Sequence, residues 1–426
     1  MDENTAANNS RKRIAIFSIH SDPLASLGSQ ESGGQNIYVR YLAEELVKFG
    51  WDIDVFTRWD SAHKKQIACI NKHCRVVRLK GGPISYFPKS ELFSILPEIF
   101  NNFLAFINFE NQYQLFHGHY WDGGWMALEA HRKFKLPFLQ NFHSLGQIRM
   151  ETKRKYQKNE KEENYFDKRF KLEKEIIQES SFIVSLSQTE KENLIQLYNC
   201  PPEKAVVIPG GVDLRHWRLM NKEKARDKLS LKDKEFIILF VGRLEWRKGI
   251  GTLISAAKML KDEIPDLKIM IVGGKIFGRN KNNADVKEYK RLIEKAKENK
   301  VENIFSFCGS VDHSQLPVFY RAADIFVIPS YYEPFGLVAL EGMANKIPVV
   351  SSRVGGLMTI TRDGETGLLF EPRNSLDLKQ KILSLFKSKD TVKSLTENAY
   401  KDVSENYPWH QIVKRINEIY NNLITK

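Results

Sequence analysis

Short apolar runs alternate with longer amphipathic segments along this chain. The short runs predict strands in two series, at residues 13–19, 52–57, 75–79, 114–117, 137–142, 182–186 and 205–208, and then at 236–241, 268–272, 304–307, 325–328, 348–351 and 367–370. The intervening segments are long enough for helices. This β/α alternation indicates parallel sheets covered by helices on both faces. The sequence therefore predicts an α/β protein in which the same pattern occurs twice.

A turn-forming run, Pro-Gly-Gly-Val-Asp at residues 209–213, separates the two series and is followed by a charged connector. We expect an N-terminal Rossmann-like domain over residues 1–212 and a C-terminal one over 213–407. Residues 408–426 carry apolar side chains at helical spacing, at Ile412, Val413, Ile416, Ile419 and Leu423. Because such a helix needs a partner surface, we expect it to cross back to the N-terminal domain.

Composition narrows the class of protein. The chain has 426 residues, of which 42% are hydrophobic, and four cysteines. The polar first residues lack a secretory apolar region, and no run approaches the roughly 18 apolar residues that span a bilayer. We therefore expect a cytoplasmic protein without a membrane span. The net charge of +13 suggests polyanions, but the lysines alternate with acidic residues as on solvated helices. Small phosphorylated molecules are thus favoured over nucleic acid.

One glycine-rich loop and one charged loop each follow a predicted strand. Doubly wound sheets bind their ligands at such positions. The run at residues 28–36 leads into a helix at 37–49 and could hold a phosphate, or could be a tight turn without a ligand. It matches neither the dinucleotide fingerprint nor a P-loop. In the second domain, Arg243 and Lys248 follow the strand at 236–241 and could neutralise a diphosphate.

A pair of glutamates, Glu333 and Glu341, brackets the start of a predicted helix near Gly336. The spacing of eight residues is about two helical turns. We therefore expect both carboxylates to face the cleft between the two predicted domains. They differ from a glycosidase pair, whose carboxylates flank the scissile bond, because both come from one binding element. The alternative is a helix N-terminal charge and a surface glutamate.

These motifs together resemble glycosyltransferase family 4. The resemblance rests on Glu-x7-Glu, Gly-Arg-Leu-x3-Lys-Gly at 242–249, Gly-Gly-Gln-Asn at 33–36 and Arg-Val-Gly-Gly at 353–356, and it extends from residue 13 to about 409. It implies the GT-B fold of two Rossmann-like domains and a retaining, metal-independent hexosyltransferase that uses a nucleotide sugar. The donor-binding residues it implies are Gly33, Gly34, Arg243, Lys248, Glu333, Phe335, Gly336, Leu337 and Glu341.

The same resemblance assigns roles to individual residues. Arg243 and Lys248 stabilise the leaving diphosphate, Glu333 lies by the sugar hydroxyls, and Glu341 binds the ribose. His143 is expected beside the transferred sugar, where it favours the oxocarbenium ion, although a histidine at a strand end can be purely structural. The catalytic set is thus His143, Arg243, Lys248 and Glu333.

Within the family, the N-terminal motifs resemble those of bacterial sucrose-phosphate synthases and of inositol-phosphate transferases. These motifs are at residues 20–23, 33–39, 56–58, 82–83, 119–121 and 143–145. Both groups use a phosphorylated acceptor, and residue-by-residue transfer gives the acceptor-binding set Gln35, Asn36, Lys89, Tyr120, Ser144 and Arg169. Surface charge is the alternative for Lys89 and Arg169. Gln35 and Ser144 depart from the usual inositol-phosphate pattern. Transfer of glucose from UDP-glucose to fructose 6-phosphate is therefore the first expectation.

Other functions remain as alternatives. They are N-acetylglucosaminyl transfer to inositol phosphate, a sucrose synthase-like activity, an epimerase and a non-catalytic nucleotide-sugar sensor. No metal or other cofactor is expected, because Cys69, His73 and Cys74 lack a second ligand pair at zinc spacing. Asp52 and Asp54 lie in a predicted strand and are interpreted as structural. The oligomeric state is left open.

Overall fold

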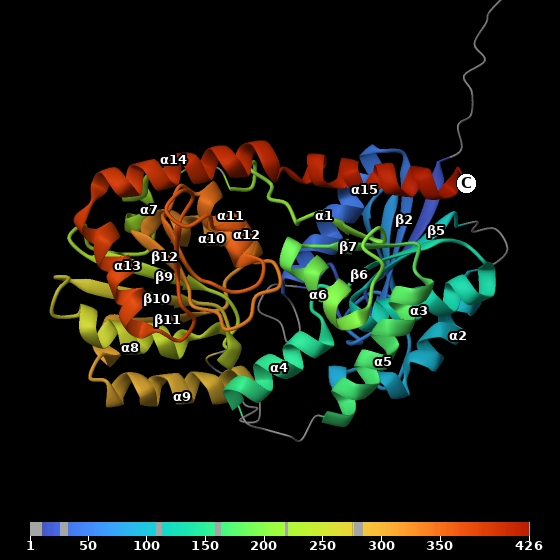
Figure 1. The fold of residues 1–426 in the computed structure, drawn as a ribbon, viewed down its shortest axis with the longest axis horizontal. Coiled ribbons are helices and arrows are strands. Elements are labelled where there is room, and N and C mark those ends of the chain that lie inside the picture. The colour runs from blue at the N-terminus through green and yellow to red at the C-terminus, as the bar shows by residue number, and fades with distance from the viewer. Residues whose placement is uncertain are drawn as a thin grey trace, which may run out of the picture.

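The two predicted series of strands form two separate sheets, each in its own domain. The structure is a computed structural model that describes residues 11–25, 33–107, 113–157, 163–217, 220–274, 276 and 284–425. Figure 1 shows the two domains side by side, with the last helices lying along one edge of both. The predicted α/β class is confirmed. Residues 28–32 of the predicted glycine-rich loop lie outside the described residues.

The N-terminal sheet has the strand order β3-β4-β2-β1-β5-β6-β7-β8. Its strands are β1 (Lys12–Phe17), β2 (Trp51–Arg58), β3 (Ile67–Asn71), β4 (Cys74–Leu79), β5 (Leu115–His119), β6 (Phe138–Asn141), β7 (Phe182–Ser185) and β8 (Ala205–Val207). Its helices are α1 (Gly34–Lys48), η1 (Lys89–Ser94), α2 (Leu96–Phe106), α3 (Tyr120–Phe134), α4 (Gly146–Gln157), α5 (Glu163–Glu179) and α6 (Gln188–Tyr198).

All pairings in this sheet are parallel except that of β3 with β4. Helices lie on both faces, so the central strands are buried on both sides and read as continuous apolar runs. The edge strand β3 was not predicted. Its residues alternate between exposed and half-buried positions, which gives a much weaker apolar signal than a buried strand.

The C-terminal sheet is entirely parallel, with the strand order β11-β10-β9-β12-β13-β14. Its strands are β9 (Phe236–Val241), β10 (Leu267–Val272), β11 (Phe305–Gly309), β12 (Ile325–Ile328), β13 (Val349–Ser352) and β14 (Leu368–Phe370). Its helices are α7 (Lys222–Lys228), η2 (Trp246–Lys248), α8 (Ile250–Leu260), α9 (Ala284–Glu298), η3 (Glu302–Ile304), η4 (His313–Gln315), α10 (Leu316–Ala322), α11 (Leu337–Ala344), α12 (Leu357–Ile360), α13 (Ser375–Lys387) and α14 (Lys389–Asn406).

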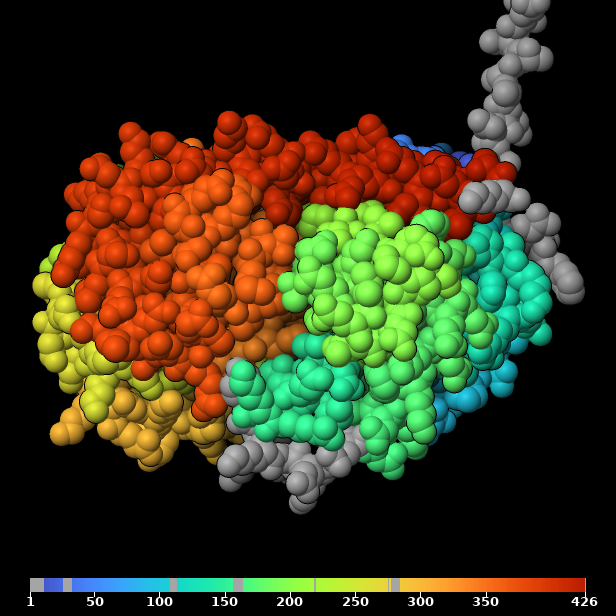
Figure 2. All heavy atoms as spheres, in the orientation of Figure 1, coloured from blue at the N-terminus to red at the C-terminus, as the bar shows by residue number. Residues whose placement is uncertain are grey.

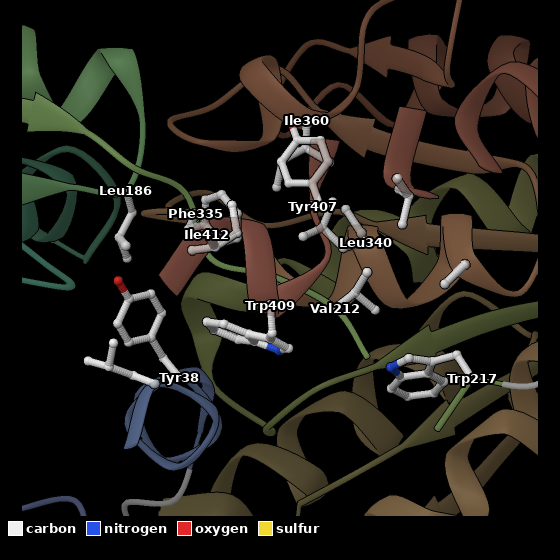
Figure 3. Close-up of a cluster of buried hydrophobic side chains, with 14 of the residues drawn as sticks. Tyr38, Leu186, Val212, Trp217, Phe335, Leu340, Ile360, Tyr407, Trp409 and Ile412 are labelled. Carbon is white, nitrogen blue, oxygen red and sulfur yellow. The ribbon is translucent and has the colours of Figure 1, made fainter. Parts of the chain in front are cut away.

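The final helix, α15 (Trp409–Ile424), leaves the C-terminal domain and packs on α1 of the N-terminal domain. Figure 2 shows this end of the chain continuing across the junction of the domains. At the crossing, the backbone N–H of Val212 donates to the carbonyl of Tyr407 at 2.8 Å. Trp409 then packs edge-on against Tyr38 at 5.4 Å between ring centroids (Figure 3). The two domains are therefore joined by two chain crossings that lie against each other.

Asp54 accepts hydrogen bonds from Arg75 Nε and the Tyr113 hydroxyl, each at 2.6 Å, so this carboxylate is occupied by structural contacts in the sheet. Among the helices of the described ranges, none has both the length and the apolar character needed to cross a membrane.

Candidate active site

A cavity of about 270 Å³ lies between the domains and is lined by both of them. Its walls come from segments that follow β1, β4, β5, β6 and β7 in one sheet and β9, β10, β11 and β12 in the other. This location follows from the topology, because parallel strands open their ligand crevices beyond their carboxyl ends. Of the residues predicted from sequence, the cavity is lined by Gly33, Gly34, Gln35, Asn36, Lys89, Tyr120, His143, Ser144, Arg243, Lys248, Glu333, Phe335, Gly336, Leu337 and Glu341.

Lys248 and Glu333 form a mostly buried ion pair in the C-terminal wall. Lys248 Nζ lies 2.5 Å from Glu333 Oε2, and the side chains are 13% and 12% exposed. The turn after Lys248 requires glycine, since Gly249 has φ 68° and an added Cβ would lie 1.8 Å from the Pro329 carbonyl oxygen. Burial alone would raise the pKa of Glu333, but Lys248 and Arg247 more than offset it and leave the pKa lowered. The side chain of Glu333 is therefore an ionised carboxylate that accepts hydrogen bonds.

Arg243 and Arg247 add two guanidinium groups to the same wall. Both pair with Glu245, through Arg243 Nη2 at 2.7 Å and Arg247 Nε at 2.5 Å. Burial by itself would raise the pKa of Glu245. The positive charges of Arg243 and Arg247 outweigh this effect and hold the pKa well below its usual range. Arg243, Arg247 and Lys248 are thus grouped on one part of this wall, where their N–H donors can bind an anionic group.

The glutamate helix begins where sequence reasoning placed it. Glu333 lies in the loop before α11, and Glu341 lies within the helix and faces the cavity. The Tyr320 hydroxyl donates to Glu341 Oε2 at 2.9 Å, which fixes one carboxylate oxygen. The other oxygen, Oε1, lies 3.8 Å from His313 Nε2, a distance that leaves it able to accept from a ligand hydroxyl, and the N–H groups at the start of α11 can bind an anion.

The opposite wall begins at the N-terminus of α1. The side chain of Asn36 closes this turn, accepting from the Gly33 N–H at 2.8 Å and donating to the Asp22 carbonyl at 2.6 Å. Gly34 lies next to the other domain, since an added Cβ would be in van der Waals contact with Leu337 Cδ1 at 3.4 Å. The N-termini of α1 and α11 therefore lie close to each other across the cavity.

His143 follows β6 and lies on the cavity wall with φ 56°, in the left-handed region. Its Nε2 is 2.8 Å from His119 Nδ1. Burial, with contributions from His117 and His20, lowers the pKa of His143 to about 3. The imidazole is thus neutral near pH 7 and can act as a hydrogen-bonding group without adding a charge.

A second cationic region surrounds the Tyr120 hydroxyl. This oxygen accepts from Arg169 Nη1 at 2.7 Å and from Arg149 Nη1 at 3.2 Å, and Lys89 Nζ lies 5.7 Å from the ring centroid. Burial raises the pKa of the Tyr120 phenol, but Arg169, Arg149 and Lys89 reverse this and leave the pKa lowered. Three basic side chains therefore surround Tyr120 at this end of the cavity.

Comparison with known proteins decides the family. Residues 32–216 match the family described as Glycosyltransferase Family 4, and residues 221–402 match Glycosyl transferases group 1. A D-inositol 3-phosphate glycosyltransferase of Corynebacterium aurimucosum is 30% identical over 414 residues, covering 96% of this chain and 95% of the relative. The chain belongs to glycosyltransferase family 4.

Solved structures of family 4 and related transferases agree with this assignment. A sucrose-phosphate synthase from Thermosynechococcus elongatus superposes with a TM-score of 0.88 at 33% identity, covering 97% of this chain and all of that one. The Anabaena protein HepE in complex with UDP and glucose shares the fold, with a TM-score of 0.74 at 19% identity over 96% of this chain and 99% of that one. The GT-B architecture expected from the sequence is therefore confirmed.

One predicted site residue of this family 4 transferase does not line the cavity. Arg169 is 0% exposed and is held by Glu173, whose Oε1 lies 2.7 Å from Arg169 Nε in an i,i+4 pair on α5. It also donates to the Ser144 carbonyl. Arg169 thus lies behind Tyr120 and Ser144, and its prediction as a direct acceptor ligand is corrected to a supporting position.

Several residues that line the cavity were not predicted from the sequence, among them Arg149, Arg247 and Tyr332. Arg149 lies in the first turn of α4, directly after the loop that carries His143 and Ser144, and Arg247 precedes Lys248. The signal for Arg149 was its position, since a basic residue at the start of a helix that follows a strand's carboxyl end faces the cleft. Arg247 gave no comparable signal, because it occupies one of the three unspecified positions of the Gly-Arg-Leu-x3-Lys-Gly motif.

Proposed function

We propose that this transferase moves glucose from UDP-glucose to fructose 6-phosphate, with retention and without a metal ion. The observation that carries the proposal is the presence of two cationic regions in one cavity. Arg243, Arg247 and Lys248 suit a diphosphate, and Lys89 and Arg149 beside Tyr120 suit a separate phosphate. His143 lies in the same cavity and would face the sugar between them.

The chemistry requires charge stabilisation more than acid–base catalysis. As the anomeric C–O bond to the diphosphate breaks, Arg243 and Lys248 would stabilise the negative charge that develops on the leaving oxygen. The acceptor hydroxyl forms the new bond on the same face and passes its proton to the departing phosphate. Glu333 would accept hydrogen bonds from the sugar hydroxyls, and neutral His143 would favour the oxocarbenium ion without repelling it.

A second acceptor class has direct support from the relatives. Several family members named D-inositol 3-phosphate glycosyltransferase are about as long as this chain and 28–30% identical to it, and their acceptor is also phosphorylated. The sucrose-phosphate synthase has the higher identity at 33%, and Gln35 and Ser144 depart from the pattern of inositol-phosphate transferases. Fructose 6-phosphate is therefore the first candidate and an inositol phosphate the second.

A two-way panel of substrates tests the proposal. UDP-, ADP- and GDP-glucose and UDP-N-acetylglucosamine are each combined with fructose 6-phosphate, inositol 3-phosphate, fructose and inositol, and products are identified by mass and anomeric NMR. We expect acceptor-dependent UDP release and an α-linked product that carries phosphate. Turnover with inositol 3-phosphate alone would select the second candidate. Turnover only with unphosphorylated acceptors, or UDP release without any acceptor, would refute the proposal.

A further inference from the structure

A hydrogen bond crosses the cavity from the donor side to the acceptor side. Tyr332, in the loop between β12 and α11, donates from its hydroxyl to Ser144 Oγ in the loop after β6, at 3.1 Å. The two residues are 188 positions apart and both line the cavity. This bond therefore exists only while the two domains are held together as they are here.

Each partner is also attached to the charged groups of its own side. The carbonyl of Tyr332 lies 3.4 Å from Arg247 Nη1, and the next residue, Glu333, pairs with Lys248. On the acceptor side, the carbonyl of Ser144 accepts from Arg169, which in turn donates to the Tyr120 hydroxyl. The Tyr332–Ser144 bond is thus a direct link between the proposed diphosphate site and the proposed acceptor-phosphate site.

The direction of this hydrogen bond determines whether the Ser144 hydroxyl can donate to a bound acceptor. Burial raises the pKa of Tyr332 to about 12, so the phenol keeps its proton near pH 7, and the geometry of the contact has this hydroxyl donating to Ser144 Oγ. A serine hydroxyl has one proton and two lone pairs. With one lone pair occupied by Tyr332, the proton of Ser144 is available to an acceptor oxygen, and polarisation along the chain strengthens that second bond.

We propose that Tyr332 is an acceptor-recognition residue supplied by the donor-binding domain, which orients the Ser144 hydroxyl toward the acceptor's phosphate when the domains are closed. The inference deepens the proposed function and rests on it. Acceptor affinity then depends on domain closure, since opening the cleft removes the donor to Ser144. Donor affinity depends less on this bond, because the charged donor-binding groups Arg243, Lys248 and Glu341 all come from the C-terminal domain.

Tyr332→Phe tests the inference, because it removes only the hydroxyl. We expect the KM for the phosphorylated acceptor to rise about tenfold, the upper part of the range for one hydrogen bond of about 1.5 kcal/mol, while the Kd for UDP measured by calorimetry is unchanged. Tyr331→Phe is the matched control. That neighbouring hydroxyl lies 3.0 Å from Thr252 Oγ1 within the same domain, so its removal leaves the acceptor KM unchanged.

A double-mutant cycle with Ser144→Ala separates a specific effect from general loosening. If Tyr332 acts through Ser144, Tyr332→Phe has no further effect on acceptor KM in the Ser144→Ala background. Additive effects, or a rise in the Kd for UDP that matches the rise in acceptor KM, would show that Tyr332 merely latches the domains and would overturn the inference.

The wild-type protein distinguishes this inference from the proposed function. If the wild type uses no phosphorylated acceptor, both are refuted before any variant is made. If it does use one and Tyr332→Phe keeps the wild-type acceptor KM, the inference alone is refuted and the proposed function stands.

Discussion

Replacing Lys248 with methionine removes a charge from the cavity while keeping most of the side-chain volume. In the structure its Nζ lies 2.5 Å from Glu333 Oε2, and both side chains are about seven-eighths buried, with 13% and 12% exposed. Solvent and salt therefore screen this charge only weakly. The substitution acts on two quantities, the stability of the fold and the stabilisation of the leaving diphosphate.

The two effects have separate magnitudes. Removing one partner of a buried ion pair leaves the other charge uncompensated, which costs about 3–5 kcal/mol of unfolding free energy. Removing one preorganised group that stabilises a developing anion lowers kcat by about 10²-fold or more. Because the diphosphate gains charge in the transition state, we expect kcat to fall further than the affinity for UDP-glucose.

Single-turnover kinetics with UDP-glucose and the accepted phosphorylated sugar measure the catalytic effect, and urea denaturation measures the stability. Lys258→Ala is the control, since Lys258 is an exposed lysine on α8 of the same domain and its loss should change neither quantity. In the variant Lys248→Met/Glu333→Gln stability should recover and activity should not. A kcat within threefold of wild type in Lys248→Met would refute the catalytic role, and a double variant no more stable than the single one would refute the buried-pair argument.

Three further predictions concern groups near the cavity. Arg149→Ala raises the acceptor KM at least about tenfold, as expected for a lost charge-assisted hydrogen bond, while the donor KM in the same assay stays within twofold; a change in donor KM instead would misplace the phosphate region. Arg169→Met leaves Glu173 buried without its partner and lowers the unfolding free energy in urea by about 3–5 kcal/mol, whereas an unchanged urea midpoint would contradict its supporting position. Burial raises the pKa of Glu190 to about 7 from 4.5, so the unfolded chain binds fewer protons between these values and stability falls as pH rises through them. Glu190→Gln should remove that decline between about pH 5 and about pH 8, and an unaltered slope would exclude Glu190 as its source.

The sheets could be predicted from the sequence because their strands are buried on both faces. The runs at 236–241 and 325–328 coincide with β9 and β12, and most others agree within two residues. The edge strand β3 escaped because only one side of it is partly covered. Burial thus produces the signal that sequence reading detects, and elements at an edge give little of it.

Site residues could be predicted where they directly follow the carboxyl end of a strand in their own domain. Arg243, Lys248 and His143 reach the cavity by this rule. Arg169 was misassigned because its i,i+4 partner Glu173 neutralises it on the helix. The spacing of this pair can be read from the sequence, but its burial cannot. The contact between Tyr332 and Ser144 depends on how the domains meet, which no local pattern encodes.

The path of α15 has a consequence for how the chain folds as it is synthesised. Tyr38 and Trp51 belong to the first domain, yet their cover includes Trp409 and Tyr420 from the last helix. During translation the first domain is complete about two hundred residues before that helix, and an apolar strip of α1 and β2 stays uncovered in the meantime. Such an exposed apolar strip favours association between partly made chains until the last helix is released.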